Sequence, residues 1–145
     1  MTAGMEVKMY RQSDKITAIY CRIDYPGSPE HIHIQRERAL AYAEQNHLEN
    51  PAVFIDDGFV GTTLDRPRLQ SMVREIRAGR VQVVVVTEFG RLVRGYPLFL
   101  DFARQVLIPY GVALHSISNG LYIPQEDTYA ELVTALSEAT ERGRD

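Results

Sequence analysis

The stretch Val81-Gln82-Val83-Val84-Val85-Val86 decides the fold class of this chain. Its four consecutive valines predict a strand with no polar face, so other layers must cover both of its faces. Strands of this kind stand in the middle of parallel sheets, whose crossover connections place helices on both faces. The stretch therefore predicts a central parallel strand.

The segments around this strand alternate between two kinds of pattern. Short β-branched and aromatic runs predict further strands at 16–21, 52–55 and 112–117. Apolar residues at helical spacing predict helices at 35–46, between Asp65 and Gly79, from about 97 to 107, and from 128 onward. This order predicts an α/β fold, a mainly parallel sheet flanked by helices on both faces. Functional groups are then expected at the carboxyl ends of the strands.

Length, charge and cysteine content restrict the class of protein. The 145 residues fit one domain, and we expect residues 1–14 to be a flexible leader and 15–145 to be that domain, without a separate DNA-binding domain. A net charge of −3 means that any DNA contact must depend on a local basic cluster. The single cysteine, Cys21, fits a reducing, cytoplasmic location. No apolar run is long enough to cross a membrane, so no membrane partner is expected.

Four arginines, Arg22, Arg66, Arg91 and Arg94, are expected to meet at one edge of the sheet. Guanidinium groups stabilise the charge that gathers on a phosphodiester in transfer, and they stay protonated at any working pH. Arg91 and Arg94 are three residues apart, which predicts that they lie on the same side of one helical turn. Any one of them alone would be read as a solvated residue. The four together indicate a phosphate site.

Three short motifs carry a resemblance to a known family. They are Gly58-Phe59-x-Gly61-Thr62, Asp65-Arg66-Pro67 and Arg91-Leu92-x-Arg94. Their order and spacing resemble the catalytic domain of the serine recombinases, the resolvase and invertase family, from residue 16 to about 142. The resemblance implies a resolvase-type fold with a C-terminal dimerisation helix. It also implies DNA as the substrate, a 5′-phosphoserine intermediate with a free 3′-hydroxyl, and no metal or other cofactor.

The resemblance also implies a set of catalytic residues. They are Arg22, Asp24, Gln35, Asp57, Arg66, Arg91 and Arg94. The four arginines correspond to those that surround the scissile DNA phosphate in the family. Gln35 corresponds to a glutamine that helps to order the nucleophile loop, and Asp57 to an acidic residue at the rim of the active site.

Three positions depart from the family pattern. Asp24 stands where the family has its nucleophilic serine, Val60 where it usually has another serine, and Gly90 where it usually has an aspartate. A carboxylate at position 24 would be repelled by the phosphate it had to attack, so we expect Asp24 to pair with the arginines instead. The sequence therefore predicts a recombinase-like catalytic domain that is deficient in DNA cleavage. It would bind DNA weakly and act as a homodimer or higher oligomer, or as a partner or modulator of an active recombinase.

Two other functions remain open at the level of sequence. One is an active site-specific recombinase with a rearranged nucleophile, for which Ser28, in the same loop, is the candidate beside Asp24. The other is a phosphoryl-ligand or protein-binding module that retains only the fold. His31 and His33 make a weak metal site without an acidic or cysteine partner and fit a solvated helix start. No lysine-serine or lysine-threonine pair follows Gly58 and Gly61, so a nucleotide cofactor is not expected.

We predict that the chain self-associates through the segment from Thr128 to about Arg142, whose apolar stripe consists of Tyr129, Leu132, Val133 and Leu136. The alternative is that this helix packs wholly on its own domain. The substitution Leu136→Asp should weaken association about tenfold or more, because it would bury an unpaired carboxylate. Sedimentation across a concentration series measures this. A strict monomer at high micromolar concentration, unchanged by Leu136→Asp, would exclude the dimer.

Overall fold

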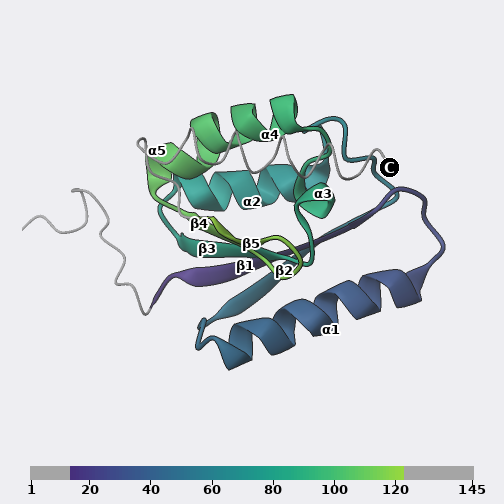
Figure 1. Cartoon of the computed structure of the whole chain (residues 1–145), viewed down its shortest axis with the longest axis horizontal. Helices are drawn as coiled ribbons and strands as arrows, with labels where there is room; N and C mark the ends of the chain where they lie inside the picture. The colour runs from purple at the N-terminus through teal and green to yellow at the C-terminus, as the bar shows by residue number, and fades with distance from the viewer. Residues whose placement is uncertain (1–13, 123–145) are drawn as a thin grey trace, which may run out of the picture.

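The computed structural model describes residues 14–122, which form a five-stranded sheet with helices on both sides (Figure 1). The strands are β1 (Ile16–Ile23), β2 (Pro51–Asp57), β3 (Val81–Val86), β4 (Ala113–Ser116) and β5 (Gly120–Tyr122). The helices are α1 (Pro29–Gln45), α2 (Pro67–Arg77), α3 (Phe89–Leu92), α4 (Tyr96–Phe102) and α5 (Ile108–Tyr110), and a π-helical segment, η2 (Ala103–Leu107), joins α4 to α5.

The sheet is parallel except at one edge. Its strand order is β2-β1-β3-β4-β5, and only the β4–β5 pair is antiparallel. The valine-rich strand β3 occupies the middle position, and its residues are almost all buried. This confirms the predicted central strand and the predicted mainly parallel α/β fold.

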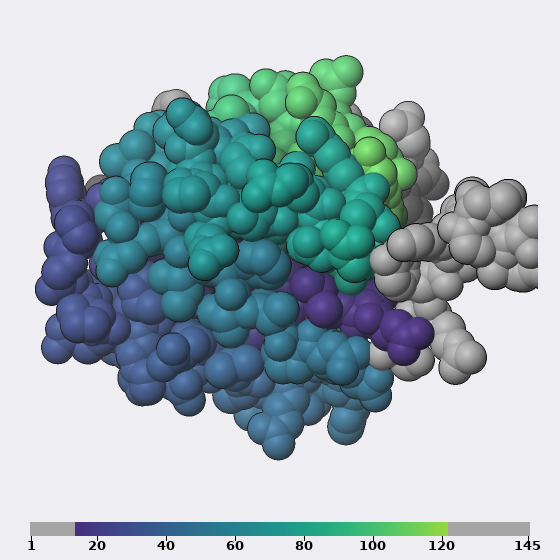
Figure 2. Space-filling model, turned by 180° about the vertical axis from the view of Figure 1, so that it is seen from behind, coloured from purple at the N-terminus to yellow at the C-terminus, as the bar shows by residue number. Residues whose placement is uncertain are grey.

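Helices form a layer on each face of the sheet. Figure 1 shows α1 on one face and α2, α4 and α5 on the other. The larger core lies on the α2 side, where Val84 and Val86 pack with Leu69, Met72 and Phe99. The smaller core lies under α1, where Val85 packs with other buried apolar residues: Ile19, Cys21, Ile23, Ile32 and Ala39. From behind, α1 (blue) lies along the lower side of the surface and the α4–α5 segment (green) along the upper side (Figure 2).

Helix α1 begins earlier than its predicted start at residue 35. It begins at Pro29, because proline suits the first turn of a helix, where its missing N–H would have no helical partner. Among the added residues 29–34, Ile32 is the buried one, and it packs in the core under α1. The apolar spacing from Ala39 onward did not reveal these first turns, which carry mostly exposed polar residues.

The predicted helix at about 97–107 is longer and less regular than expected. The helical backbone runs from Tyr96 through α4, η2 and α5 to Tyr110 and ends at Gly111, whose φ of 63° is left-handed. Strand β5 was not predicted, because glycine and proline punctuate the segment after Ile117 and indicated a loop. It forms a hairpin with β4, whose turn is held by the backbone N–H of Asn119, which donates to Ser116 Oγ at 3.1 Å.

Two predicted segments lie outside the described residues: nearly all of the 1–14 leader and the C-terminal helix with its apolar stripe. Within residues 14–122, every helix is too short or too polar to span a bilayer.

The parallel strands bring three loops to one edge of the sheet. Strands β1 and β2 end together, with Ile23 opposite Asp57, and β3 runs parallel beside β1. The loops after β1, β2 and β3 therefore leave the same edge, as the sequence predicts.

Candidate functional site

Arg22 lies at the centre of this edge and is fully buried. Its guanidinium donates four hydrogen bonds: Nε to Arg91 O at 3.0 Å, Nη1 to Phe59 O at 2.9 Å and to Asp24 Oδ1 at 2.5 Å, and Nη2 to Gly90 O at 2.8 Å. Burial lowers the pKa of Arg22, but an arginine pKa is normally so far above neutrality that the group stays charged. Arg22 therefore ties the ends of β1, β2 and β3 together.

Asp24 shares its carboxylate between two arginines. Oδ1 accepts from Arg22 Nη1 at 2.5 Å and from Arg94 Nη2 at 3.3 Å, and Oδ2 accepts from Arg94 Nη1 at 3.1 Å. The hydrogen bond from Arg22, assisted by Arg94, holds the pKa of Asp24 below its usual value. The expected pairing of Asp24 with the arginines is thus what the structure contains, and the carboxylate occupies the space between them.

Gln35 reaches the same strand end from α1. Its Oε1 accepts from the backbone N–H of Arg22 at 3.0 Å, and its Nε2 donates to the backbone carbonyl of Arg22 at 2.9 Å. The buried amide thereby satisfies both backbone groups of one residue, as a neighbouring strand would. This contact joins α1 to the residue that organises the site.

Arg66 is also fully buried. It donates from Nε to Thr63 O at 2.8 Å, from Nη1 to the Tyr20 hydroxyl at 2.9 Å and from Nη2 to Leu92 O at 2.6 Å. Its guanidinium also lies 5.6 Å from the centre of the Tyr20 ring. Within the described residues, every nitrogen of this side chain has a partner, so Arg66 holds the loops in place.

Asp56 is a buried residue, and the sequence pattern pointed to its neighbour Asp57 instead. Its Oδ2 accepts from the Tyr20 hydroxyl at 2.6 Å, and its two oxygens accept from the backbone N–H groups of Arg68 and Leu69 at 2.9 Å each. Burial, with the Asp56 contact second, raises the pKa of Tyr20 far above its usual value. The carboxylate therefore caps α2 and anchors the network that holds Arg66.

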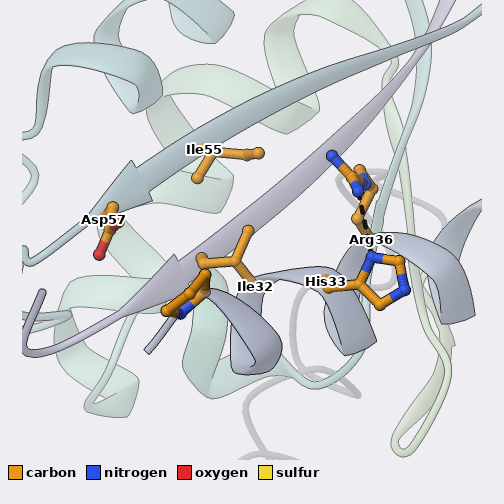
Figure 3. Close-up of a pocket in the computed structure, with 6 residues that line it drawn as sticks. Ile32, His33, Arg36, Ile55 and Asp57 are labelled. Atoms are coloured by element: carbon orange, nitrogen blue, oxygen red, sulfur yellow. Dashed lines mark hydrogen bonds between the residues drawn. The ribbon is translucent and has the colours of Figure 1, made fainter. Parts of the chain in front are cut away.

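Asp57 lies away from the arginines. Successive side chains of a strand point to opposite faces, so Asp57 points to the α1 side while Asp56 points to the α2 side. Asp57 is exposed and lines a pocket with Ile55 and residues of α1 (Figure 3). The residues before the two aspartates in β2 are all apolar, so no alternation in the sequence separates Asp56 from Asp57.

The prediction that Arg91 and Arg94 share a helical turn is wrong. Helix α3 ends at Leu92, and Val93 has an extended backbone with φ −146° and ψ 133°. Arg91 instead donates from Nη1 to Arg22 O at 3.3 Å, and its buried Nε has no hydrogen-bond partner within residues 14–122. The Arg94 side chain is 49% exposed and carries the salt bridge to Asp24. The two arginines still meet at the site, but from different backbone segments.

Gly61 lies where only a glycine fits without a shift of its neighbours. An added Cβ would lie 2.7 Å from Arg22 Nη2, 2.9 Å from Arg22 Cζ and 3.2 Å from Arg94 Cβ. The Gly61 carbonyl also accepts from the backbone N–H of Arg94 at 2.8 Å. The small residue lets the β2 loop pack directly against the buried guanidinium.

Two candidate side chains stand at the border of the site. Ser28 occupies the position before α1, is half-buried, and makes no capping hydrogen bond through its hydroxyl. Val60 is 43% exposed. His31 and His33 are exposed on α1, and no group of three or more histidine, cysteine or acidic side chains within residues 14–122 is arranged to hold a metal ion.

Comparison with known proteins agrees with this geometry. The profile described as "Resolvase, N terminal domain" matches residues 17–144, so the chain belongs to this family. The chain has no significant match among curated proteins. The chain therefore resembles a serine recombinase catalytic domain in sequence, and its structure has the fold of such a domain.

Solved structures give the same fold. The N-terminal catalytic domain of TP901-1 integrase is 25% identical, with a TM-score of 0.73 over 90% of this chain and 97% of that one. A resolvase family site-specific recombinase from Streptococcus pneumoniae is 23% identical, with a TM-score of 0.68 over 90% and 91%. The C-terminal catalytic domain of ISC1926 TnpA, an IS607-like serine recombinase, is 22% identical, with a TM-score of 0.62 over 83% and 78%.

The contact between Gly61 and Arg22 predicts a steric effect on stability. Gly61→Ala should lower the free energy of unfolding by about 1–3 kcal/mol, because the methyl group must displace the guanidinium or the loop. Gly90→Ala is the matched control: an added Cβ there meets nothing within 4 Å. We expect the control to be neutral or stabilising by up to about 1 kcal/mol. Urea unfolding measures both, and equal effects would contradict the proposed contact.

The Asp24 pairing predicts a pH-dependent contribution to stability. Because the folded state lowers the pKa of Asp24, its contribution is present above the unfolded-state value of about 4 and is lost as the pH falls through the lower folded-state value. Asp24→Asn should therefore be less stable than the parent by about 1–3 kcal/mol at pH 7. The difference should shrink toward pH 3. Urea unfolding at both pH values tests this, and a difference of equal size at the two would refute it.

Proposed function

We propose that this domain has the frame of a serine recombinase but does not cleave DNA, and that it acts as a dimerising partner or modulator of an active recombinase. The site residues of this proposal are Arg22, Asp24, Gln35, Arg66, Arg91 and Arg94. The observation that carries it is the Asp24 carboxylate, which accepts hydrogen bonds from Arg22 and Arg94. The sequence resemblance implies that Asp24 corresponds to the nucleophilic serine of the family. Asp57 is left out because it faces the α1 side.

The chemistry of Asp24 supports the loss of cleavage. Hydrogen bonds from guanidinium groups withdraw electron density from both Asp24 oxygens, which makes the carboxylate a weaker nucleophile toward phosphorus. The carboxylate is also an anion, so it repels the phosphate oxygens that the arginines would otherwise attract. Asp24 therefore acts as an internal counter-ion of the arginine cluster.

The arginines leave few donors for DNA. Arg22 and Arg66 direct theirs to backbone carbonyls, Asp24 and the Tyr20 hydroxyl. The Arg94 side chain is 49% exposed, so Arg94 is the member of the cluster best placed to meet a phosphate. With a net charge of −3, this supports DNA binding that is weak, independent of sequence and strongly salt-dependent.

A working recombinase with a rearranged nucleophile is the second candidate. The observation that favours it is the Ser28 hydroxyl, which lies in the loop after β1 and makes no capping hydrogen bond. In that mechanism Ser28 Oγ would form a bond to the phosphorus as the bond from phosphorus to the deoxyribose 3′-oxygen breaks. The proton of the Ser28 hydroxyl would pass through solvent to the departing 3′-oxygen, which leaves as a 3′-hydroxyl. The loop would have to move Ser28 toward Arg91 and Arg94 for this to occur.

We predict that the purified protein forms no covalent DNA adduct. Incubation with supercoiled DNA that carries candidate sites, followed by a detergent quench, should leave no protein-linked 5′ ends above the background of the Ser28→Ala variant. An active serine recombinase assayed in parallel is the positive control. A reproducible adduct that disappears in Asp24→Ala or in Ser28→Ala would refute the non-cleaving function and identify the nucleophile.

A further inference from the structure

We propose that the groove between α1 and the free edge of β2 binds an extended peptide segment of a partner protein. A pocket of about 430 Å³ opens there. Its lining residues are Pro29, Ile32, His33, Arg36, Ile55 and Asp57 (Figure 3). None of these residues belongs to the arginine cluster, and Asp57 is not among the site residues of the proposed function. The groove is therefore a separate surface.

The groove presents an apolar centre between opposite charges. Ile32 from α1 and Ile55 from β2 lie in the middle, with Asp57 toward the end of β2 and Arg36 beside an earlier part of the strand (Figure 3). Arg36 Nη2 lies 3.2 Å from His33 Nδ1, which places the imidazole of His33 next to the guanidinium. The other partner of Arg36 is Glu37, at 3.5 Å, in an exposed pair of little energetic weight. Arg36 is therefore available to a carboxylate.

The backbone of β2 offers a second means of binding. Within residues 14–122, β2 pairs with β1 alone and forms one edge of the sheet. Every other N–H and C=O along its outer side thus points away from the sheet, where an added strand can pair with them. Val53, Ile55 and Asp57 alternate along the strand and share its α1 side. A strand added to this edge would place alternate side chains in the groove.

These two features together define the partner's chemistry. The side chains that face the groove should be a cation opposite Asp57, an apolar residue over Ile32 and Ile55, and an anion toward Arg36. In the peptide, one residue between each two of these positions would point to the opposite face of the added strand. The free strand edge favours a peptide over a small zwitterion, because a small molecule would leave the β2 backbone unpaired. The inference concerns binding and does not depend on whether the domain cleaves DNA.

Fluorescence anisotropy with synthetic peptides tests this proposal. The probes are as long as β2 and carry lysine, valine and glutamate at alternate positions, in that order or in reverse, with threonine at every other position. One order should bind with a dissociation constant below about 1 mM, since a parallel and an antiparallel strand require opposite orders. A peptide with its charged residues moved to the threonine positions is the control and should bind more weakly.

Protein variants test the charged contacts in the groove, and methylation of the peptide backbone tests its pairing with β2. Asp57→Lys should weaken binding of the preferred peptide about fivefold or more, and a peptide with glutamate in place of lysine should recover affinity for this variant. Asp101→Lys makes the same charge change at an exposed position on α4, on the opposite face of the sheet, and should have no effect. N-methylation of one alternate set of peptide nitrogens should abolish binding, and methylation of the other set should not.

Three results would overturn the proposal. They are the absence of binding of either peptide order below about 1 mM, equal binding of the permuted control, and binding that survives methylation of both sets. The last result would show a side-chain pocket without strand addition. Thermal unfolding of each variant confirms that it remains folded, so a loss of binding can be assigned to the groove.

Discussion

The buried guanidinium of Arg22 is the interaction on which the rest of the site depends. A charge removed from water is tolerated only when its donors are satisfied, and Arg22 meets this condition with four hydrogen bonds to three different loops. Those bonds fix the carbonyls of Phe59, Gly90 and Arg91 around a single centre. Gly61 permits the close approach, and Gln35 holds the backbone from the other side. Without this centre, the ends of the three parallel strands would have no common partner.

Asp24 changes the electrostatics of that centre. With Arg22, Arg66, Arg91 and Arg94 together, the edge would be strongly positive and would attract an anion from solution. The Asp24 carboxylate supplies the anion from within the chain and links Arg22 to Arg94. The carboxylate thus offsets the charge of the buried Arg22, and the cluster remains positive where Arg94 reaches the surface.

Much of the fold could be predicted from the sequence, because hydrophobic patterning carries it. Four valines identified the central strand, and the alternation of strands and helices gave the parallel topology. The β4–β5 hairpin could not be predicted, since a strand of three residues with a glycine leaves almost no pattern. The first turns of α1 were missed for a related reason: their residues are mostly polar and exposed.

The site was predictable by residue type but not by the direction of each side chain. The sequence named the arginines that gather, yet not that Arg22 and Arg66 donate mainly to backbone carbonyls, because carbonyls are common to every residue. It also could not distinguish Asp56 from Asp57, which differ only in the face of β2 to which they point.

Arg22 and Arg66 are fully buried, whereas Arg94 is exposed, and this difference determines which residues the stability of the fold requires. Selection for stability alone would retain Arg22, Arg66 and Gly61 in this frame whether or not DNA is cleaved. A motif built on these three residues therefore reports the frame of the family and carries no information on whether the chain cleaves DNA.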